Sequence, residues 1–136
     1  MLVGRAGTLP SWEQEIIEEI AAERGVDPVG LAAVRLTENG GPGREFGVLV
    51  LPDGSPPPTD YRGQASWAAR SLRASEDRYR SQTGQEARTS TGRYTDEFLR
   101  FFSARYAPVG AANDPSGLNR YHADNLVAAY EGSRLG

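Results

Sequence analysis

Glycine and proline divide this chain into short helical segments that are joined by turns. Residues 11–24 place Trp12, Ile16 and Ile20 at helical spacing, and Gly25 supplies the stop. The glutamates of this segment fall mostly on the opposite face, which we interpret as a solvated surface. The first helix is therefore expected to bury one apolar stripe.

A second helix is expected directly after the first, in the segment VDPVGLAAVRLTE. Asp27 is a natural N-cap and Pro28 suits the first helical position. Two helices joined by a tight turn also form DNA-binding modules, but this second helix offers only Arg35 behind an acidic first helix. The net charge of −3 likewise lacks a basic footprint, so we expect no nucleic-acid partner.

The rest of the chain is expected to add one short strand and three helices. EFGVLVL, residues 45–51, has the composition of a strand, and the proline-rich loop PDGSPPPTDY follows it. The expected helices cover about residues 63–79, about 95–107 and about 118–131. The sequence therefore predicts one domain over residues 1–136, of class α+β, predominantly α, with a very small β element.

Composition excludes several kinds of chemistry. The chain has no cysteine, which removes disulfides and thiol catalysis, and its single histidine, His122, cannot build a zinc site alone. We expect His122 at the surface or at a groove edge. No apolar run approaches the roughly 18 residues of a membrane helix, and the N-terminus has no signal-peptide core. We expect no metal, no cofactor and no membrane partner.

Glu38 is the candidate catalytic residue. It follows Val34 by four residues and Leu31 by seven, so the three share the helix face that points to a core or cleft. Partial burial and the negative end of the helix dipole both favour a protonated carboxyl, as a general acid requires. The glycines after it leave room for a chain-like substrate. The alternative is a frayed helix end, with Gly40 serving only as its cap.

Three stretches resemble a known family. A helix that ends in an acid, a glycine loop and the FG segment resemble the lysozyme-like superfamily of peptidoglycan glycosidases, with its glucosaminidase and phage-lysin branches. TDYRGQASWAARSLR resembles a later helix of that family, and FLRFFSARYAPVGAANDPSGLNRYHADNLVAAY resembles its C-terminal segment. The resemblance covers about residues 12–131. It implies that Glu38 is the catalytic acid and that the sugar groove includes Gly47, Tyr61, Tyr106, Asn113 and Asp114.

One expected feature of such an enzyme is not obvious, namely a second carboxylate. The segment between Gly47 and Tyr61 is very short for a glucosaminidase, and it leaves Asp53, Asp60 and the nearby Glu45 as candidates. The alternative is assistance by the N-acetyl group of the substrate, as in lytic transglycosylases, which use a single glutamate as acid and then as base. The choice between hydrolysis and a 1,6-anhydro product stays open.

We therefore expect a monomeric enzyme that cleaves the glycan strands of peptidoglycan, as a glycoside hydrolase or a lytic transglycosylase. Without a signal peptide, a phage lysin is the natural setting, held in the host cytoplasm until holin-type release or carried in the virion. Many wall-lytic enzymes are basic, and this chain is acidic. The alternative is a non-catalytic phage structural or wall-binding module, for which Glu38 would be exposed and no groove would join it to Tyr106.

Overall fold

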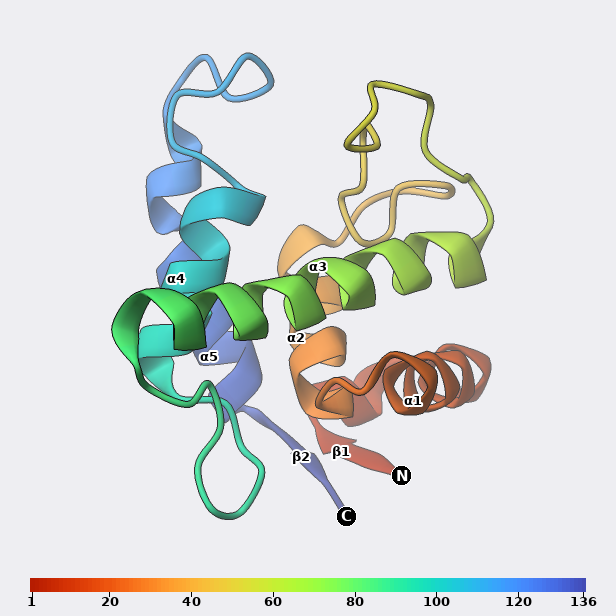
Figure 1. The fold of residues 1–136 in the computed structure, drawn as a ribbon. Coiled ribbons are helices and arrows are strands. Elements are labelled where there is room, and N and C mark those ends of the chain that lie inside the picture. Colours follow the sequence, from red (N-terminus) through yellow and green to blue (C-terminus); the bar gives the residue numbers. More distant parts are fainter.

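The computed structural model describes residues 1–136 and contains five α-helices, two short 3-10 helices and one two-stranded sheet (Figure 1). The fold is α+β and predominantly α, as the sequence predicts. In chain order the elements are β1 (Leu2–Gly4), η1 (Ala6–Thr8), α1 (Ser11–Arg24), α2 (Pro28–Glu38), α3 (Tyr61–Thr83), α4 (Asp96–Tyr106), η2 (Leu118–Tyr121), α5 (His122–Glu131) and β2 (Ser133–Leu135).

The helices begin and end close to the signals in the sequence. The carboxylate of Asp27 accepts a hydrogen bond from the Val29 amide at 3.0 Å and so caps α2, and Gly25 ends α1 with a φ of 70°. The helix predicted over residues 63–79 extends further at both ends, because Asp60 caps it and it continues for more than a turn beyond residue 79. The last helix begins later than predicted, since residues 118–121 form the 3-10 helix η2.

Helix α2 lies at the centre of the molecule. Residues 29–34 of this helix are all buried, and all but Gly30 belong to one cluster of 28 buried residues to which every α-helix contributes. Gly30 allows a close approach on one side, because a Cβ there would lie only 2.3 Å from the ring of Tyr94. Helix α3 crosses in front of α2 (Figure 1). The C-terminal end of α2, which carries Glu38, is therefore held by its neighbours.

The predicted strand over residues 45–51 is wrong. These residues form turns and irregular loop, and the sheet lies instead where the two chain ends meet: β1 pairs antiparallel with β2, with Leu2 opposite Leu135 and Gly4 opposite Ser133. Strands need a partner for their backbone groups. No partner strand lies beside residues 45–51, because the Gln64 side chain takes the backbone hydrogen bonds of Val48.

A buried polar network ties α2, α3 and α5 together at the end away from Glu38. The Tyr130 hydroxyl donates to Asp27 at 2.5 Å, and the Tyr94 hydroxyl donates to Glu76 at 2.8 Å. Arg88 completes the network with an ion pair to Glu76 at 2.9 Å. Since each buried carboxylate has a donor, this network is a structural element of the core.

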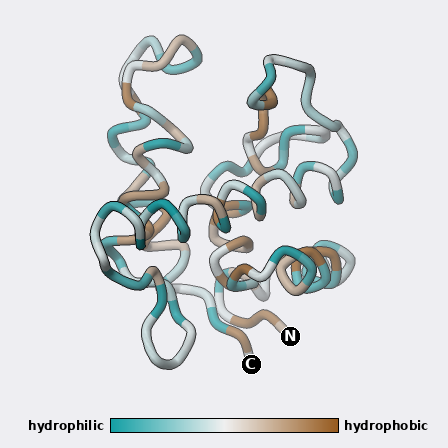
Figure 2. Tube along the Cα trace, viewed as in Figure 1, coloured by the Kyte–Doolittle hydropathy of each residue, from teal (hydrophilic) through white to brown (hydrophobic).

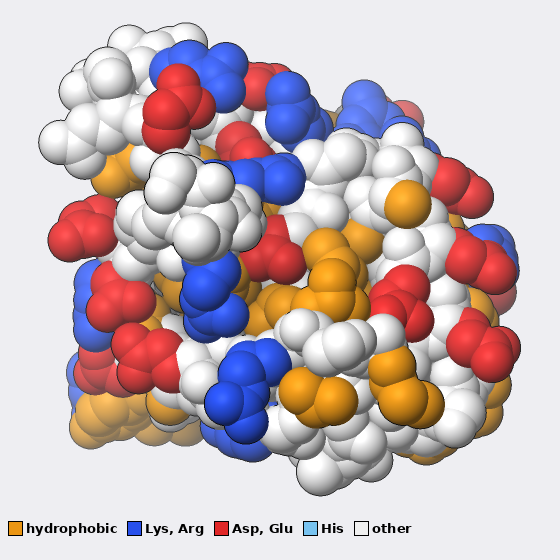
Figure 3. All heavy atoms as spheres, turned by 90° about the horizontal axis from the view of Figure 1, so that it is seen from below, with side chains coloured by type: hydrophobic (Ala, Val, Ile, Leu, Met, Phe, Trp, Pro, Cys, Tyr) orange, Lys and Arg blue, Asp and Glu red, His pale blue; other side chains and the backbone are white.

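Two loops stand on either side of a space above α3, namely residues 39–60 and residues 107–117 (Figure 1). The first loop carries an apolar segment at residues 48–51 (Figure 2), in which Leu49 and Val50 are exposed. The opposite side of the molecule shows acidic side chains gathered along the edge that α1 forms (Figure 3), as expected for a solvated helix face. No helix is long and apolar enough to cross a membrane.

Candidate active site at the end of α2

Glu38 is the last residue of α2, and its side chain is 18% exposed. Val34 and Leu31, which share its helix face, are buried in the core. Asn39 follows in the left-handed conformation with φ 44°, and its amide donates to the Arg35 carbonyl to end the helix. The carboxyl group is therefore mostly shielded by protein and still reaches solvent.

The glycine loop folds back over this carboxyl group. A Cβ at Gly40 would lie 1.8 Å from the Arg44 carbonyl oxygen, so the turn can close only with glycine there. Gly47 has a φ of 72°, and a Cβ at this position would lie 2.6 Å from the Glu38 carboxyl carbon. The backbone of residue 47 therefore lies directly against the Glu38 side chain, and a larger residue would displace one of the two.

Two side chains fix the loop in this position. The buried Gln64 amide donates to the carbonyls of Val48 and Pro58 at 3.0 and 2.8 Å, and its carbonyl oxygen accepts from the Val48 amide at 3.3 Å. From α4, the Tyr106 hydroxyl donates to the Phe46 carbonyl at 2.5 Å. The segment that covers Glu38 is thus tied to both α3 and α4.

The Tyr106 hydroxyl lies in the electrostatic field of Glu38. Burial raises the pKa of Tyr106, and the negative charge of Glu38 raises it further. The hydroxyl is therefore a neutral hydrogen-bond donor throughout the range in which glycosidases act. Its ring stacks on Phe102 with centroids 4.8 Å apart, which holds it in place.

His122 is a site residue that the sequence analysis missed. We predicted it at the surface or at a groove edge, and this is wrong, because the side chain is only 7% exposed. Its Nε2 atom lies 3.5 Å from Oε1 of Glu38, and its Nδ1 atom lies 2.6 Å from the Ser103 hydroxyl oxygen. The helical spacing to Leu126 and Tyr130, both buried, is the signal that places it on the inward face of α5.

Ser103 holds this ring through its hydroxyl group. The hydroxyl oxygen is hydrogen-bonded to Nδ1, whichever of the two atoms donates, and Nε2, on the side toward Glu38, is buried without a hydrogen-bond partner. Ser103 itself is 2% exposed. Because no substrate could reach it, the Ser103–His122–Glu38 row is not a nucleophilic serine triad.

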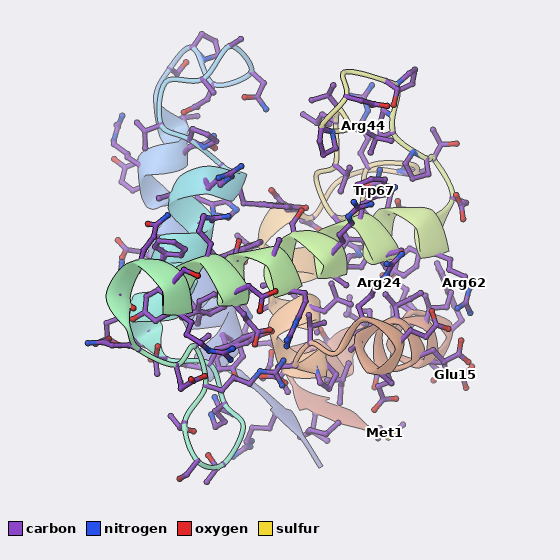
Figure 4. The ribbon with its side chains drawn as sticks, in the orientation of Figure 1. Met1, Glu15, Arg24, Arg44, Arg62 and Trp67 are labelled. Carbon is purple, nitrogen blue, oxygen red and sulfur yellow. The ribbon has the colours of Figure 1, made fainter.

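An open cavity of about 590 Å³ lies beside this group of residues. Loop residues 47–52 form one wall, helix α3 forms another, and Tyr106 and Asn113 close the third side. Trp67 lines it from α3 and lies on the side of α3 that faces the loop (Figure 4). Glu38 does not itself line the cavity, but its carboxyl group lies against Gly47, which does, and its charge acts on Tyr106, which also does, so Glu38 adjoins the edge of the cavity.

The structure brings together some of the predicted groove residues and separates others. Gly47, Tyr106 and Asn113 all line the cavity. Tyr61 does not, because it is 9% exposed and packs in the core between Trp12 and Phe46, with ring centroids 4.9 and 5.2 Å away. We therefore place Tyr61 outside the site, as a core residue that supports the loop.

Asp114 is buried within its own loop. Its carboxylate accepts hydrogen bonds from the backbone amides of Gly110, Leu118 and Asn119, at 2.8 to 3.1 Å. Burial alone would raise the pKa of Asp114, but these amides outweigh it and the pKa is lowered. Asp114 thus shapes the loop that presents Asn113, and it does not line the cavity.

The three candidates for a second carboxylate differ in their surroundings. Asp53 is exposed and accepts from the Ser55 amide and hydroxyl, and Asp60 is exposed and caps α3. Glu45 is half-buried, and its Oε1 atom is buried without a hydrogen-bond partner. A buried carboxylate oxygen without a donor is costly in free energy. Of the three candidates, Glu45 is therefore the one whose burial is not accounted for by hydrogen bonds within its own loop.

The comparisons with known proteins found no match: no family model, no curated protein and no solved structure matches this chain. No group of three or more histidine, aspartate or glutamate side chains is arranged to hold a metal ion. The chemistry of the site therefore has to be inferred from Glu38 and its neighbours.

Proposed function

We propose that this protein cleaves the glycan strands of peptidoglycan, with Glu38 as the general acid. The observation that carries the proposal is the setting of this carboxyl group: it ends α2, is mostly shielded by protein, and lies against Gly47, which lines an open cavity. A carboxyl that protonates a leaving oxygen needs such a site, partly desolvated and still reachable by substrate.

In the proposed reaction, Glu38 gives its proton to the glycosidic oxygen as the bond between that oxygen and the anomeric carbon breaks. His122 acts as a positioning residue, since its Nε2 atom faces Oε1 of Glu38. Tyr106 holds the loop above the acid through the Phe46 carbonyl. No metal or cofactor takes part in this step.

The positive charge that develops on the anomeric carbon is met in one of two ways. Either Glu45 acts as the second carboxylate, or the N-acetyl oxygen of the substrate attacks and Glu38 later acts as a base. Asp53 and Asp60 are weaker candidates because both are exposed and already accept hydrogen bonds from their own turns.

The resemblance of the three stretches to lysozyme-like glycosidases supports the same proposal, including a fold of that type for the whole chain. We propose a phage lysin as its setting, released by a holin or carried in the particle. The wall-binding alternative expects an exposed Glu38 without a groove to Tyr106. The shielded carboxyl and the cavity that Tyr106 lines support the catalytic proposal instead.

The test is cleavage of purified peptidoglycan by the wild type and by Glu38→Gln. We expect the substitution to lower the rate of turbidity loss by about 10²-fold or more, as for other general acids, while the circular dichroism spectrum stays unchanged. Mass spectrometry of the soluble products then identifies the reaction: 1,6-anhydro ends indicate a transglycosylase, and new reducing ends indicate a hydrolase.

A matched control is Glu15→Gln, which removes an exposed glutamate of α1 far along the chain from the site (Figure 4). It should cleave as fast as the wild type. If the wild type releases no glycan fragments, or if Glu38→Gln cleaves as fast as Glu15→Gln, the proposal is wrong.

A further inference from the structure

The cavity beside Glu38 has a wall of positive charge. Arg70 and Arg78 face it from α3, where they are eight residues apart on one helix face, and Arg105 faces it from α4. The 16 residues that line the cavity include these three arginines and no aspartate or glutamate. The chain has 18 acidic and 15 basic residues, so the composition does not explain why only positive side chains line this cavity.

None of the three arginines has a carboxylate partner within 4.0 Å. Of the other twelve arginines, six form an ion pair, namely Arg35, Arg62, Arg73, Arg80, Arg88 and Arg100, and six do not. Two of the cavity arginines are held by aromatic rings instead: Arg70 lies over Trp67 at 4.6 Å and Arg78 lies over Phe101 at 4.9 Å. Stacking orients a guanidinium and leaves its donors free for a ligand.

Arg78 and Arg105 also repel each other. Burial lowers the pKa of Arg78, and the positive charge of Arg105 lowers it further. Ser75 is the only side chain that accepts a hydrogen bond from Arg78, at 3.3 Å. Two like charges without a counter-ion between them are destabilising, and a bound anion would remove that cost.

We propose that this arginine wall, Arg70, Arg78 and Arg105, binds the carboxylates of the peptide that is attached to the glycan strand. The proposal rests on the proposed function and specifies its substrate: a glycan that carries acidic peptide stems, in preference to an uncharged polymer of the same sugars. A guanidinium presents paired donors that match a carboxylate. With Glu38 at the edge of the same cavity, the wall would place a stem-bearing sugar against the acid.

The experiment measures binding by calorimetry in the Glu38→Gln background, in which the ligands survive. Three ligands are compared: a tetrasaccharide of N-acetylglucosamine, a disaccharide–tetrapeptide fragment of peptidoglycan, and the same fragment with its carboxylates converted to amides. We expect the acidic fragment to bind at least fivefold more tightly than either neutral ligand. Its affinity should also fall between 0.05 and 0.5 M salt, because screening weakens exposed charge pairs.

Arg78→Gln and Arg105→Gln should each weaken binding of the acidic fragment roughly fivefold and leave the neutral ligands unaffected. The matched control is Arg80→Gln, which removes an exposed arginine of the same helix that does not line the cavity. It should leave all three affinities unchanged. Arg105 is exposed, so its replacement does not disturb the core.

The outcomes separate the two proposals. If the acidic and amidated fragments bind equally, or if the arginine variants bind the acidic fragment as tightly as Arg80→Gln does, the arginine wall is not a carboxylate site, even where the wild type cleaves peptidoglycan. Failure of all three ligands to bind also overturns it. Arginine-dependent binding in a protein that cleaves nothing would instead overturn the proposed catalysis and keep the anion site.

Discussion

His122 and Ser103 form a buried hydrogen bond beside Glu38 that can be measured on its own. Replacing either residue with alanine leaves the other without its buried partner, and each change should cost about 1–3 kcal/mol in the free energy of unfolding. The double variant should cost less than the sum of the single variants by about 1 kcal/mol, because the bond can be lost only once. Urea unfolding of the four proteins gives these values.

The control for this cycle is Ser81→Ala, an exposed serine of α3, which should change the free energy of unfolding by less than about 0.5 kcal/mol. In the peptidoglycan assay, Ser103→Ala should lower kcat more than it changes KM, because it acts through the orientation of His122 and does not touch the substrate. Strict additivity of the two substitutions would contradict the bond between Ser103 and His122.

The residues of the site were predicted in two ways: from their closeness along the chain, and from the resemblance, which supplied Tyr106 and Asn113. Glu38 and Gly47 are nine residues apart, and the helix stop and the glycines between them indicate their arrangement. Tyr61 and Asp114 were also predicted from the resemblance, but the structure gives both of them structural positions. Tyr61 packs against Trp12 and Phe46, and Asp114 accepts hydrogen bonds from backbone amides. The contact between α2 and α5 that brings His122 to Glu38 depends on tertiary packing, which helical spacing does not specify.

The 39–60 loop behaves as one element, and Gln64 is the side chain that holds it. Gln64→Leu keeps the volume but leaves the Val48 amide and the Val48 and Pro58 carbonyls without partners, so we expect a loss of about 2–4 kcal/mol, from several unsatisfied groups at about 1–3 kcal/mol each with partial relaxation. Hydrogen exchange should become faster at residues 46–48 while α2 keeps its protection.

Gln82→Leu is the matched control, because Gln82 is an exposed residue of the same helix. It should leave the exchange pattern unchanged. Equal protection at residues 46–48 in Gln64→Leu and in the wild type would show that the loop is held by its apolar contacts, chiefly those of the buried Phe46, and not by the Gln64 amide.

The same glutamine explains which elements the sequence could predict. Helices carry their own hydrogen bonds and their own caps, so Asp27 and the 3.6-residue spacing sufficed for α1 and α2. A strand needs a partner, and the β-like composition of residues 45–51 could not indicate that a side-chain amide would take that place. The true strands have three residues each and pair across nearly the whole chain length, which no local pattern signals.

For the whole molecule, four tyrosines with raised pKa values predict how the fold responds to alkali. Burial is the main cause that raises the pKa of Tyr61, Tyr94, Tyr106 and Tyr130 above the ordinary value of 10.0, so the folded state holds these protons more tightly than the unfolded state. Their contribution to stability is complete below pH 10 and is lost as the pH rises through the folded values, by roughly 1.4 kcal/mol per pH unit for each tyrosine.

Cooperative unfolding is therefore expected about one to two units above pH 10, since four such slopes together reach the 5–15 kcal/mol of a typical domain. Absorbance at 295 nm, which reports tyrosinate, should show one step that coincides with the loss of helical circular dichroism. In 6 M guanidinium chloride all six tyrosines should titrate near pH 10 without a step. A folded protein in which the four hydroxyls ionise gradually, before any helix is lost, would mean that they are accessible to solvent. In that case the hydrogen bond from the Tyr106 hydroxyl to the Phe46 carbonyl, which ties the 39–60 loop to α4 beside Glu38, would not keep the hydroxyl from solvent.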